Sequence, residues 1–316
     1  MIAAAAGTTE PSLKGHPVAE GIWRLADPKI TLASVASMVV GTAAAAHDGP
    51  IAWGWLALTV LGVFGVEVGK NASGELVDFD SGTDLAVADD DRTPFSGGKR
   101  VLVDRLLTRE QTKAVAAAGY ALALAAGLAI VAWREPRVLW LGLLGAACAF
   151  FYHAPPLKLS YRGLGELAVA VCYGPLIAAG TYLVQRGSVS GDLFRLSLPL
   201  GLLIASFLWI NEFPDCDADR AAGKRTLVVR LGRDAASRVF AVIVALAYAG
   251  LATLPVTGLP PAILLGLAGL PFGVAAAARL MRSPRATPRI VPAQAWTLVS
   301  FLLMAAGSAL GLLLAG

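Results

Sequence analysis

The sequence predicts an all-α membrane protein built as a bundle of nine transmembrane helices. Of its 316 residues, 56% are hydrophobic and only 15% are charged, whereas soluble domains average about 25% charged residues. Nine apolar stretches have the length of roughly 20 residues that a membrane-crossing helix needs. Lysine and arginine are distributed unequally between the loops that join these stretches, as in proteins with a fixed membrane orientation. No segment has the pattern of a β-strand.

The apolar stretches run almost without interruption from residue 30 to the last residues of the chain. They cover approximately residues 30–47, 51–70, 112–133, 136–153, 164–186, 193–211, 235–256, 259–281 and 291–315. We therefore expect one transmembrane domain over residues 30–316, preceded by a cytosolic N-terminal segment over residues 1–29. The first ten residues contain no basic side chain, so we expect no cleaved signal peptide.

The basic residues predict the orientation of the bundle. Only Arg134, Arg137, Arg186 and Arg195, of 26 lysines and arginines, fall on one side. The other side carries the N-terminus and the loops 71–111, 154–163, 212–234 and 282–290. Because cytosolic loops are rich in lysine and arginine, we expect these loops in the cytosol, an integral protein of the cell (inner) membrane, and an outside C-terminus.

A polar motif follows the sixth apolar stretch. Asp215 and Asp219 stand four residues apart, so they share one face of a helix, and Asn211 continues the same stripe. Lys224 and Arg225 follow directly. Carboxylate and amide oxygens bind hard cations, and lysine and arginine bind phosphate. The motif therefore predicts a site for magnesium and a diphosphate at the membrane surface.

A second acidic stretch follows the second apolar stretch. Asn71, Glu75 and Asp78 have the spacing i, i+4, i+7, which places them on one helix face, and Asp84 comes shortly afterwards. So many carboxylates at helix ends would repel one another without a cation. The repeated pattern suits two halves whose matched polar ends converge on one central site.

Further basic and aromatic side chains lie in the loops of the same side. The long loop after Ala86 contains Arg92 among charges of alternating sign, and we expect it to form a lid over the site. Lys158 and Arg162 follow two prolines that end the fourth apolar stretch. We expect these bases and Lys29 to bind the diphosphate; the alternative is that they only set the topology or, for Lys29, extend to the interface.

These motifs together resemble those of the UbiA-type intramembrane prenyltransferases. Within that superfamily the chain is most similar to the 1,4-dihydroxy-2-naphthoate polyprenyltransferase branch of menaquinone synthesis. The resemblance extends from about Trp23 to the last helix. It rests on residues 26–34, 75–84, 91–93, 152–158, 161–166 and 215–227.

The resemblance implies a fold and a set of site residues. It implies nine helices around a central lipid-open cavity with cytosolic cap loops. The implied Mg²⁺ ligands are Glu75, Asp78, Asp84, Asn211, Asp215 and Asp219, and the residues expected to be catalytic are Asp78, Asp215, Asp219 and Lys158. The first motif departs from the family pattern, because Gly74 stands where an asparagine is usual and Glu75 where an aspartate is usual. Asn71 could partly replace that asparagine.

The resemblance also implies an activity. Magnesium-dependent enzymes of this type transfer a prenyl group from a polyprenyl diphosphate to a small aromatic acceptor, for which 1,4-dihydroxy-2-naphthoate is expected here. The implied diphosphate-binding residues are Lys29, Arg92, Lys158, Arg162, Lys224 and Arg225. The candidate cavity residues are Asn71, Tyr152, Tyr173, Phe207 and Trp209, of which Tyr173, Phe207 and Trp209 would stabilise an allylic cation. Besides these substrates we expect the lipid bilayer and no nucleic acid as partners, and the oligomeric state stays open.

Three alternatives remain open from the sequence. An intramembrane terpene cyclase of the same superfamily would ionise the same diphosphate without an acceptor, and the altered first motif permits this. A secondary transporter would hold its acidic residues near the middle of the membrane, whereas the two acidic motifs lie at helix ends. A structural scaffold would leave both acidic motifs unexplained.

Overall fold

The computed structural model describes residues 16–316, and every regular element in that range is a helix. The predicted all-α class is therefore confirmed. The predictions for the first fifteen residues of the N-terminal segment, including the absence of a cleaved signal peptide, lie outside the described residues. Besides α-helices, the described residues form several short 3-10 helices and one π-helix.

The α-helices are α1 (Pro17–Ala26), α2 (Pro28–His47), α3 (Trp53–Ser81), α4 (Thr83–Ala86), α5 (Arg109–Trp133), α6 (Val138–His153), α7 (Gly165–Val171), α8 (Ile177–Arg186), α9 (Gly191–Ala221), α10 (Leu227–Leu231), α11 (Arg233–Thr253), α12 (Leu270–Arg282) and α13 (Thr287–Ala315). The 3-10 helices are η1 (Asp89–Asp91), η2 (Leu159–Tyr161), η4 (Leu254–Thr257) and η5 (Pro261–Gly269). A π-helix, η3 (Cys172–Leu176), joins α7 to α8.

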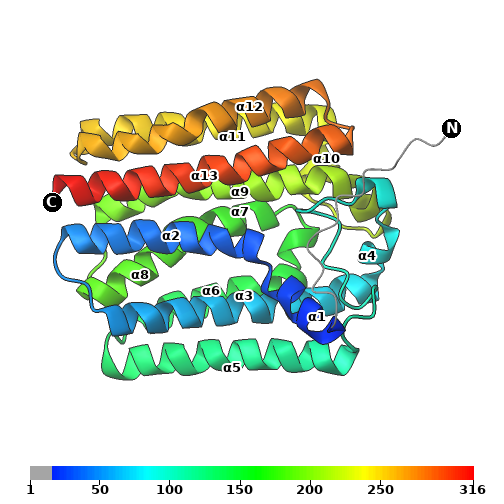
Figure 1. The fold of residues 1–316 in the computed structure, drawn as a ribbon, viewed down its shortest axis with the longest axis horizontal. Helices are drawn as coiled ribbons and strands as arrows, with labels where there is room; N and C mark the ends of the chain where they lie inside the picture. The colour runs from blue at the N-terminus through cyan, green and yellow to red at the C-terminus, as the bar shows by residue number, and fades with distance from the viewer. Residues whose placement is uncertain (1–15) are drawn as a thin grey trace.

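The long helices run side by side as a bundle, with α5 along one margin and α11 and α12 along the opposite one (Figure 1). α9 and α13 lie between these margins. The main hydrophobic core is formed by buried side chains of α2, α9, α11, α12 and α13. In its apolar stretch α9 is 72% buried, compared with 22% for α5, so α9 is a central helix and α5 an outer one.

Seven segments in the described range are long and apolar enough to cross a membrane. They coincide with seven of the nine predicted spans. The other two predictions, residues 51–70 and 136–153, fall on α3 and α6. α6 has only 16 residues, and the apolar part of α3 contains Glu67 and Lys70. By length and composition, seven of the predicted spans are supported, and the other two stay predictions.

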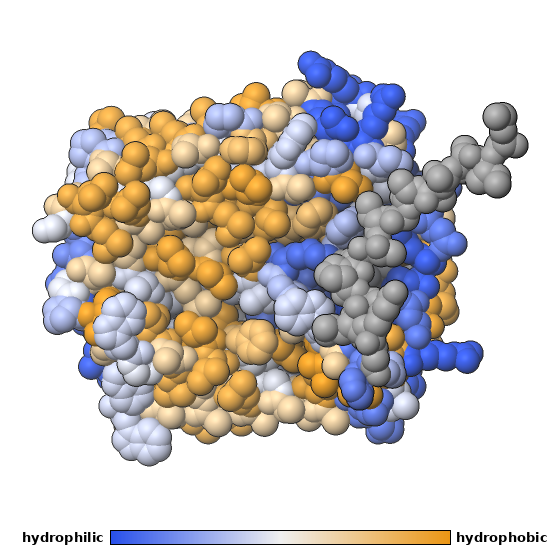
Figure 2. Space-filling view, viewed as in Figure 1, coloured by the Kyte–Doolittle hydropathy of each residue, from blue (hydrophilic) through white to orange (hydrophobic). Residues whose placement is uncertain are grey.

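The two ends of the bundle differ in polarity. Figure 2 shows a broad hydrophobic band across the helices and a concentration of hydrophilic residues at the end that carries α4 and α10 in Figure 1. At the opposite end Trp53, Trp133 and Trp140 are 72%, 76% and 70% exposed. Exposed tryptophans at helix ends are typical of a membrane–water interface. The bundle therefore has the surface of an integral membrane protein.

Glycine allows α3 and α5 to pack closely. A Cβ atom on Gly119 of α5 would lie 2.7 Å from the backbone nitrogen of Gly69 and 2.8 Å from the carbonyl oxygen of Gly65, both on α3. Small residues at such crossings let helix backbones approach one another in membranes. This contact matters for the site, since α3 carries one of the two acidic motifs.

A pair of alanine substitutions on α5 tests this packing. Gly119→Ala should lower the thermal stability of the detergent-solubilised protein, at a cost of about 1–3 kcal/mol, because the new methyl group meets backbone atoms that cannot move aside. Gly127→Ala is the matched control, since no neighbouring helix or loop lies within 4 Å of its added Cβ, and it should gain about 0.5–1 kcal/mol from helix propensity. Equal melting temperatures for the two variants would contradict the close contact.

Candidate active site

The two acidic motifs meet at one end of the bundle. Glu75 and Asp78 lie on α3, Asp84 lies on α4, and Asp215 and Asp219 lie in the last turns of α9. Burial raises the pKa of Asp84 to about 8, and the negative charges of Asp78, Glu75 and Asp215 contribute to the rise. Acids from three helices are therefore close enough to repel one another.

The motif on α9 holds several oxygen atoms without hydrogen-bond partners. Within residues 16–316, Oδ1 of Asn211, Oδ1 of Asp215 and Oδ2 of Asp219 are buried and accept no hydrogen bond, while the buried Oδ1 of Asp219 is paired with the Lys224 ammonium. Leaving such groups unsatisfied costs about 1–3 kcal/mol each, and more when they are charged. Oxygens held in this way are suited to bind a cation, so this donor set fits a metal ion such as Mg²⁺.

Lys224 supplies positive charge between the two motifs. Its Nζ lies 3.3 Å from Oδ1 of Asp219, and its side chain is 17% exposed. Burial lowers the pKa of Lys224, but the negative charges of Asp219, Asp78 and Asp215 outweigh this effect and raise the pKa well above its usual value. Lys224 therefore stays protonated and partly neutralises the cluster.

The carboxylates do not surround a single point. In the described part of the chain no group of three His, Cys, Asp or Glu side chains is close enough to hold a metal ion by itself. The acids instead form two sets that face each other. Mg²⁺ usually keeps only one or two protein carboxylates and takes its other ligands from water and substrate phosphates, so two facing sets suit ions bridged by a phosphate ligand.

A cavity of about 750 Å³ connects this acidic end to the interior of the bundle. Asp78 and Asp84 line its polar end, and Val138 and Val184 line the other. Its walls come mainly from α3, α5, α6, α8 and α9. A chamber with charged groups at one end and apolar side chains along its length can hold an amphipathic molecule, with the charged head at the acids.

The sequence profile of the UbiA prenyltransferase family matches residues 34–298. The chain belongs to the UbiA prenyltransferase family. The predicted family and the predicted class of enzyme, a prenyltransferase, are thereby confirmed.

Two mycobacterial proteins are similar to this UbiA prenyltransferase over most of their length. A 1,4-dihydroxy-2-naphthoate octaprenyltransferase of Mycobacterium tuberculosis is 32% identical over 268 residues, which are 84% of this chain and 88% of the relative. The protein of the same name in Mycobacterium leprae is 31% identical over 297 residues, which are 92% of this chain and 95% of the relative. The match therefore extends across the acidic motifs and the cavity.

Solved structures of the family share the fold. The apo structure of a UbiA homolog from Aeropyrum pernix K1 has a TM-score of 0.69 at 20% identity and covers 88% of this chain and 97% of its own. A UbiA homolog from Archaeoglobus fulgidus bound to GPP and Mg²⁺ has a TM-score of 0.59 at 14% identity, with 90% and 99% covered. At these identities the similarity establishes the fold alone.

In the first motif of this UbiA prenyltransferase some polar atoms already have structural partners. Glu75 accepts a hydrogen bond from the Leu102 backbone N–H at 2.8 Å, which attaches the loop after α4 to α3. The Asn71 amide donates to the Leu25 carbonyl at 2.9 Å, which attaches α1. The Asp78 carboxylate is bound less tightly, since the Tyr161 hydroxyl donates to its Oδ1 over a long distance of 3.4 Å.

The His153 side chain fills the space beside Gly74, where the family pattern has an asparagine. A Cβ on Gly74 would lie 2.9 Å from Nε2 of His153, so the imidazole at the end of α6 occupies the space beside residue 74. Its Nδ1 is buried without a hydrogen-bond partner in the described range and lies 4.0 Å from Oδ1 of Asp78. The ring thus lies where the expected asparagine side chain would project.

The loop between α4 and α5 approaches the acidic site at Gly98, and its role as a lid stays a prediction. Gly98 touches Asp84 so closely that an added Cβ would lie 2.2 Å from its Oδ1, and its φ of +77° also favours glycine. Farther back, Phe95 packs edge-on against Phe207 of α9 with ring centroids 5.8 Å apart. Lys29 donates to the Pro94 carbonyl at 2.7 Å. The loop is therefore attached to both α2 and α9.

The six predicted diphosphate-binding bases occupy different surroundings. Lys224 forms an ion pair with Asp219 of α9. Lys158 lies with Nζ 5.2 Å from the centre of the Tyr161 ring, and Arg92 pairs with Asp89 at 2.5 Å.

Arg162 and Arg225 are exposed. The Arg225 backbone N–H donates to the Tyr161 carbonyl at 3.1 Å, so this residue joins two loops while its side chain lies outside the cavity.

Four of the five predicted cavity residues line the cavity: Asn71, Tyr152, Tyr173 and Phe207. The prediction for Trp209 is wrong. Its side chain is 3% exposed and lies between α9 and α11, where Nε1 donates to the Ala236 carbonyl at 3.1 Å. Trp209 therefore stabilises the packing of two helices and does not face a substrate.

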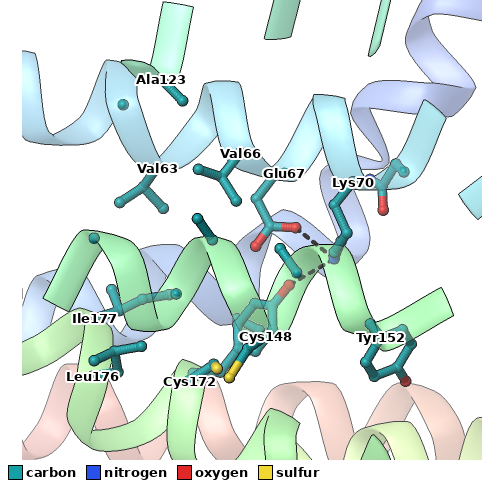
Figure 3. Close-up of a pocket in the computed structure, with 18 of the residues that line it drawn as sticks. Val63, Val66, Glu67, Lys70, Ala123, Cys148, Tyr152, Cys172, Leu176 and Ile177 are labelled. Atoms are coloured by element: carbon teal, nitrogen blue, oxygen red, sulfur yellow. Dashed lines mark hydrogen bonds and ion pairs between the residues drawn. The ribbon is translucent and has the colours of Figure 1, made fainter. Parts of the chain in front are cut away.

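Two charged residues in the cavity wall were not among the predicted site residues. Glu67 and Lys70 extend from α3 toward the cavity (Figure 3), where Nζ of Lys70 lies 3.0 Å from Oε2 of Glu67. The signal was present in the sequence, because two ionisable residues within one predicted span, 51–70, are by default a candidate functional site.

Removing charge from the acidic cluster should stabilise the protein when no divalent cation is bound. The pKa of Asp84, about 8 in the folded protein and 3.8 ordinarily, makes the folded state bind a proton more tightly than the unfolded chain. The melting temperature in EDTA should therefore fall as pH rises from about 5 to 8.5. Asp84→Asn should raise the melting temperature at the upper pH and flatten this dependence.

Asp80→Asn is the matched control for that measurement. Asp80 lies four residues earlier, at the end of α3, but it is 55% exposed and paired with Arg109, so its loss should leave the pH dependence in place. If Asp84→Asn melted at the same temperature as the parent protein across this pH range, repulsion around Asp84 would be refuted.

Proposed function

We propose that this UbiA prenyltransferase transfers a prenyl group from a polyprenyl diphosphate to an aromatic acceptor, with 1,4-dihydroxy-2-naphthoate as the acceptor. The observation that carries the proposal is the pair of facing acidic motifs at the mouth of a largely apolar cavity. A diphosphate fits the charged end and a prenyl chain fits the apolar walls. The names of the mycobacterial relatives support the choice of acceptor.

Magnesium is the proposed cofactor. The Archaeoglobus fulgidus homolog of the same fold holds Mg²⁺ together with GPP, and the unpartnered oxygens on α9 fit a cation here. The residues that would hold it are Glu75, Asp78 and Asp84 on one side and Asn211, Asp215 and Asp219 on the other. Bound there, magnesium supplies the positive charge that makes diphosphate a better leaving group.

The chain's own residues would prepare the reaction. Lys224 lies between the motifs, where its ammonium group can donate to diphosphate oxygens. Lys158 and Arg92 lie in loops, and Lys29 lies in the first turn of α2. When the allylic carbon–oxygen bond breaks, its electron pair leaves with the diphosphate. Charge stabilisation of that leaving group is what lowers the barrier.

The cavity wall would then protect the cation. The Phe207 and Tyr173 rings line the chamber, and aromatic faces stabilise positive charge while apolar walls exclude water. A ring carbon of the acceptor attacks the allylic carbon and forms the new bond. For a naphthoate attacked at its carboxylated carbon, the carboxylate leaves as carbon dioxide and its bonding electrons return to the ring.

The proposal includes the topology. We propose that α3 and α6 also cross the bilayer, which gives nine crossings within one domain over residues 30–316, and that the cavity opens toward lipid. The acidic end would face the cytosol of a cell (inner) membrane. The loops rich in lysine and arginine at that end support this orientation, as do the exposed tryptophans at the other.

Product analysis separates this function from its nearest alternative. The purified protein in nanodiscs would receive geranylgeranyl diphosphate and Mg²⁺, with or without 1,4-dihydroxy-2-naphthoate, and products would be identified by mass spectrometry. A decarboxylated prenyl-naphthoquinol that forms only with acceptor supports the proposal. A cyclic hydrocarbon or alcohol formed without acceptor would instead identify a terpene cyclase. Family membership does not support the transporter and scaffold alternatives.

The acids on α9 should be indispensable for turnover. Asp215→Asn and Asp219→Asn should each reduce the rate by about a hundredfold or more, because each removes a charged oxygen ligand from the diphosphate site. Asp217→Asn is the matched control: it lies between the two on α9, but it is 60% exposed and pairs with Arg220 and Arg233. Full activity of an Asp215→Asn, Asp219→Asn double variant would refute the mechanism.

Restoring the family asparagine should require a second change. Gly74→Asn alone should lower both stability and activity, because the new side chain would meet the His153 ring. Adding His153→Ala provides the space, and the double variant should then need less Mg²⁺ for half-maximal activity than His153→Ala alone. An unchanged Mg²⁺ titration would show that residue 74 has no part in metal binding.

A further inference from the structure

The cavity contains a polar cluster on the stretch of α3 that directly precedes the first acidic motif. Lys70 donates to Oε2 of Glu67 at 3.0 Å and to the Tyr173 hydroxyl at 2.8 Å. The second oxygen of Glu67 accepts a hydrogen bond from the Ser34 hydroxyl at 2.6 Å. We call Glu67, Lys70 and Tyr173 the inner cluster. Figure 3 shows Glu67 and Lys70 on the wall formed by α3, with Cys148 and Cys172 nearby.

The inner cluster lies deeper in the bundle than the diphosphate site. Lys70 precedes Asp78 on α3 by eight residues, or about 12 Å along the helix axis at 1.5 Å per residue. Tyr152 also lines the cavity, and Val63 and Val66 lie on the far side of the cluster from it (Figure 3). The cluster therefore marks the boundary between the polar mouth and the apolar chamber.

A buried ion pair at this depth is expensive if it only holds helices together. The Glu67 and Lys70 side chains are 5% and 18% exposed. Taking two charges out of water costs several kcal/mol that their attraction often fails to repay, and a hydrophobic pair would pack α2, α3 and η3 more cheaply. Ionisable residues at membrane depth are typically found where a ligand needs them.

The backbone around Tyr173 is also unusual. Tyr173 lies in the π-helix η3 between α7 and α8, where the ordinary α-helical hydrogen bonding is interrupted. The Ser37 hydroxyl donates to the Tyr173 carbonyl and satisfies it. Such π-helical turns occur frequently at functional sites. Here the turn belongs to the wall that presents the Tyr173 hydroxyl to Lys70.

We propose that the inner cluster binds a hydroxyl group of the aromatic acceptor and selects hydroxylated rings. This inference rests on the proposed function, whose acceptor it places at a defined depth. An aromatic hydroxyl can donate one hydrogen bond and accept another. A Glu67 oxygen can accept its hydrogen bond, and the Lys70 ammonium can donate one to its oxygen. The hydrogen bonds described above use two of the three N–H bonds of Lys70.

The location of the inner cluster also agrees with the order in which the diphosphate, the allylic carbon and the acceptor ring must lie along the cavity. The allylic carbon lies next to the diphosphate, and the prenyl chain must extend into the apolar chamber. The acceptor ring must touch that carbon, so its hydroxyls have to lie just inside the mouth. With its ring in that position, a hydroxyl on the inner side would reach the inner cluster, while a ring without hydroxyls would leave a buried ion pair without its ligand.

Binding without turnover tests the inference directly. The dissociation constants of 1,4-dihydroxy-2-naphthoate, kept anaerobically, and of 2-naphthoate, which lacks both hydroxyls, would be measured in detergent without prenyl diphosphate. We expect the parent protein to prefer the dihydroxy compound by about tenfold or more, as for hydrogen bonds to charged groups. Lys70→Met and Glu67→Gln should each remove most of this preference while 2-naphthoate binding stays unchanged.

Two controls separate binding from a structural role. Lys113→Met removes a charge whose partner, Glu110, is 81% exposed, and it should leave the preference intact. The exchange Glu67→Lys, Lys70→Glu keeps an ion pair but reverses its positions. If the pair served only packing, the exchange would restore both stability and acceptor preference; for a binding role, stability should recover and the preference should not.

Steady-state kinetics gives an independent readout. Lys70→Met should raise the KM for the acceptor about tenfold while leaving the KM for polyprenyl diphosphate unchanged. If Lys70→Met does not fold, Tyr173→Phe keeps the ion pair and removes only the hydroxyl, and a partial loss of the preference is expected. An unchanged ratio of dissociation constants in folded variants would overturn the inference. Absence of any product would refute the proposed function, and the binding ratio would still test the inner cluster.

Discussion

The structure depends on concentrating negative charge where water is scarce. Acids from α3, α4 and α9 lie close enough that Asp78, Glu75 and Asp215 raise the pKa of Asp84, and oxygens on α9 remain without partners. Such an arrangement opposes folding unless positive charge compensates for it. Lys224 supplies one charge, and the negative charge that remains favours the binding of a cation at this end of the bundle.

The fold makes this repulsion tolerable by fixing its two sides independently. α9 is held by the main hydrophobic core, which it shares with α2, α11, α12 and α13. α3 is held by close packing on α5 through Gly65, Gly69 and Gly119. Since each motif sits on a helix anchored away from the site, the carboxylates cannot relax apart. Electrostatic energy is thus stored in geometry, as expected for a preorganised site.

Much of this architecture could be predicted from the sequence because hydrophobic length and helical spacing are local signals. The i, i+4 and i+7 spacings placed the acidic motifs on single helix faces, and the apolar stretches located the long helices. The same spacing explains the error at Trp209. Residues two apart on a helix do not share a face, so Phe207 and Trp209 cannot both line one cavity; Ile204, Phe207, Leu208 and Asn211 do.

The sequence could not determine where long, flexible side chains go. Lys224, Arg225 and Arg162 are all basic and lie in loops at the same end of the bundle. Of these three, only Lys224 points inward and pairs with Asp219. That choice depends on loop conformation and on contacts between segments far apart in the chain, such as the bond from Arg225 to Tyr161. The sequence also could not show that the His153 ring fills the space beside Gly74, because the two residues lie on different helices.

α3 shows how function conflicts with the simplest membrane helix. Glu67 and Lys70 reduce its apolar character, and the seven helices that meet the length and composition of a membrane span do not include it. Their mutual pairing limits the cost, since a neutral ion pair enters a low-dielectric region more readily than two separate charges. A helix selected only for insertion would carry apolar residues at both positions. The place where the spanning pattern weakens is therefore where the cavity acquires its polar wall, as expected when local rules are broken at functional sites.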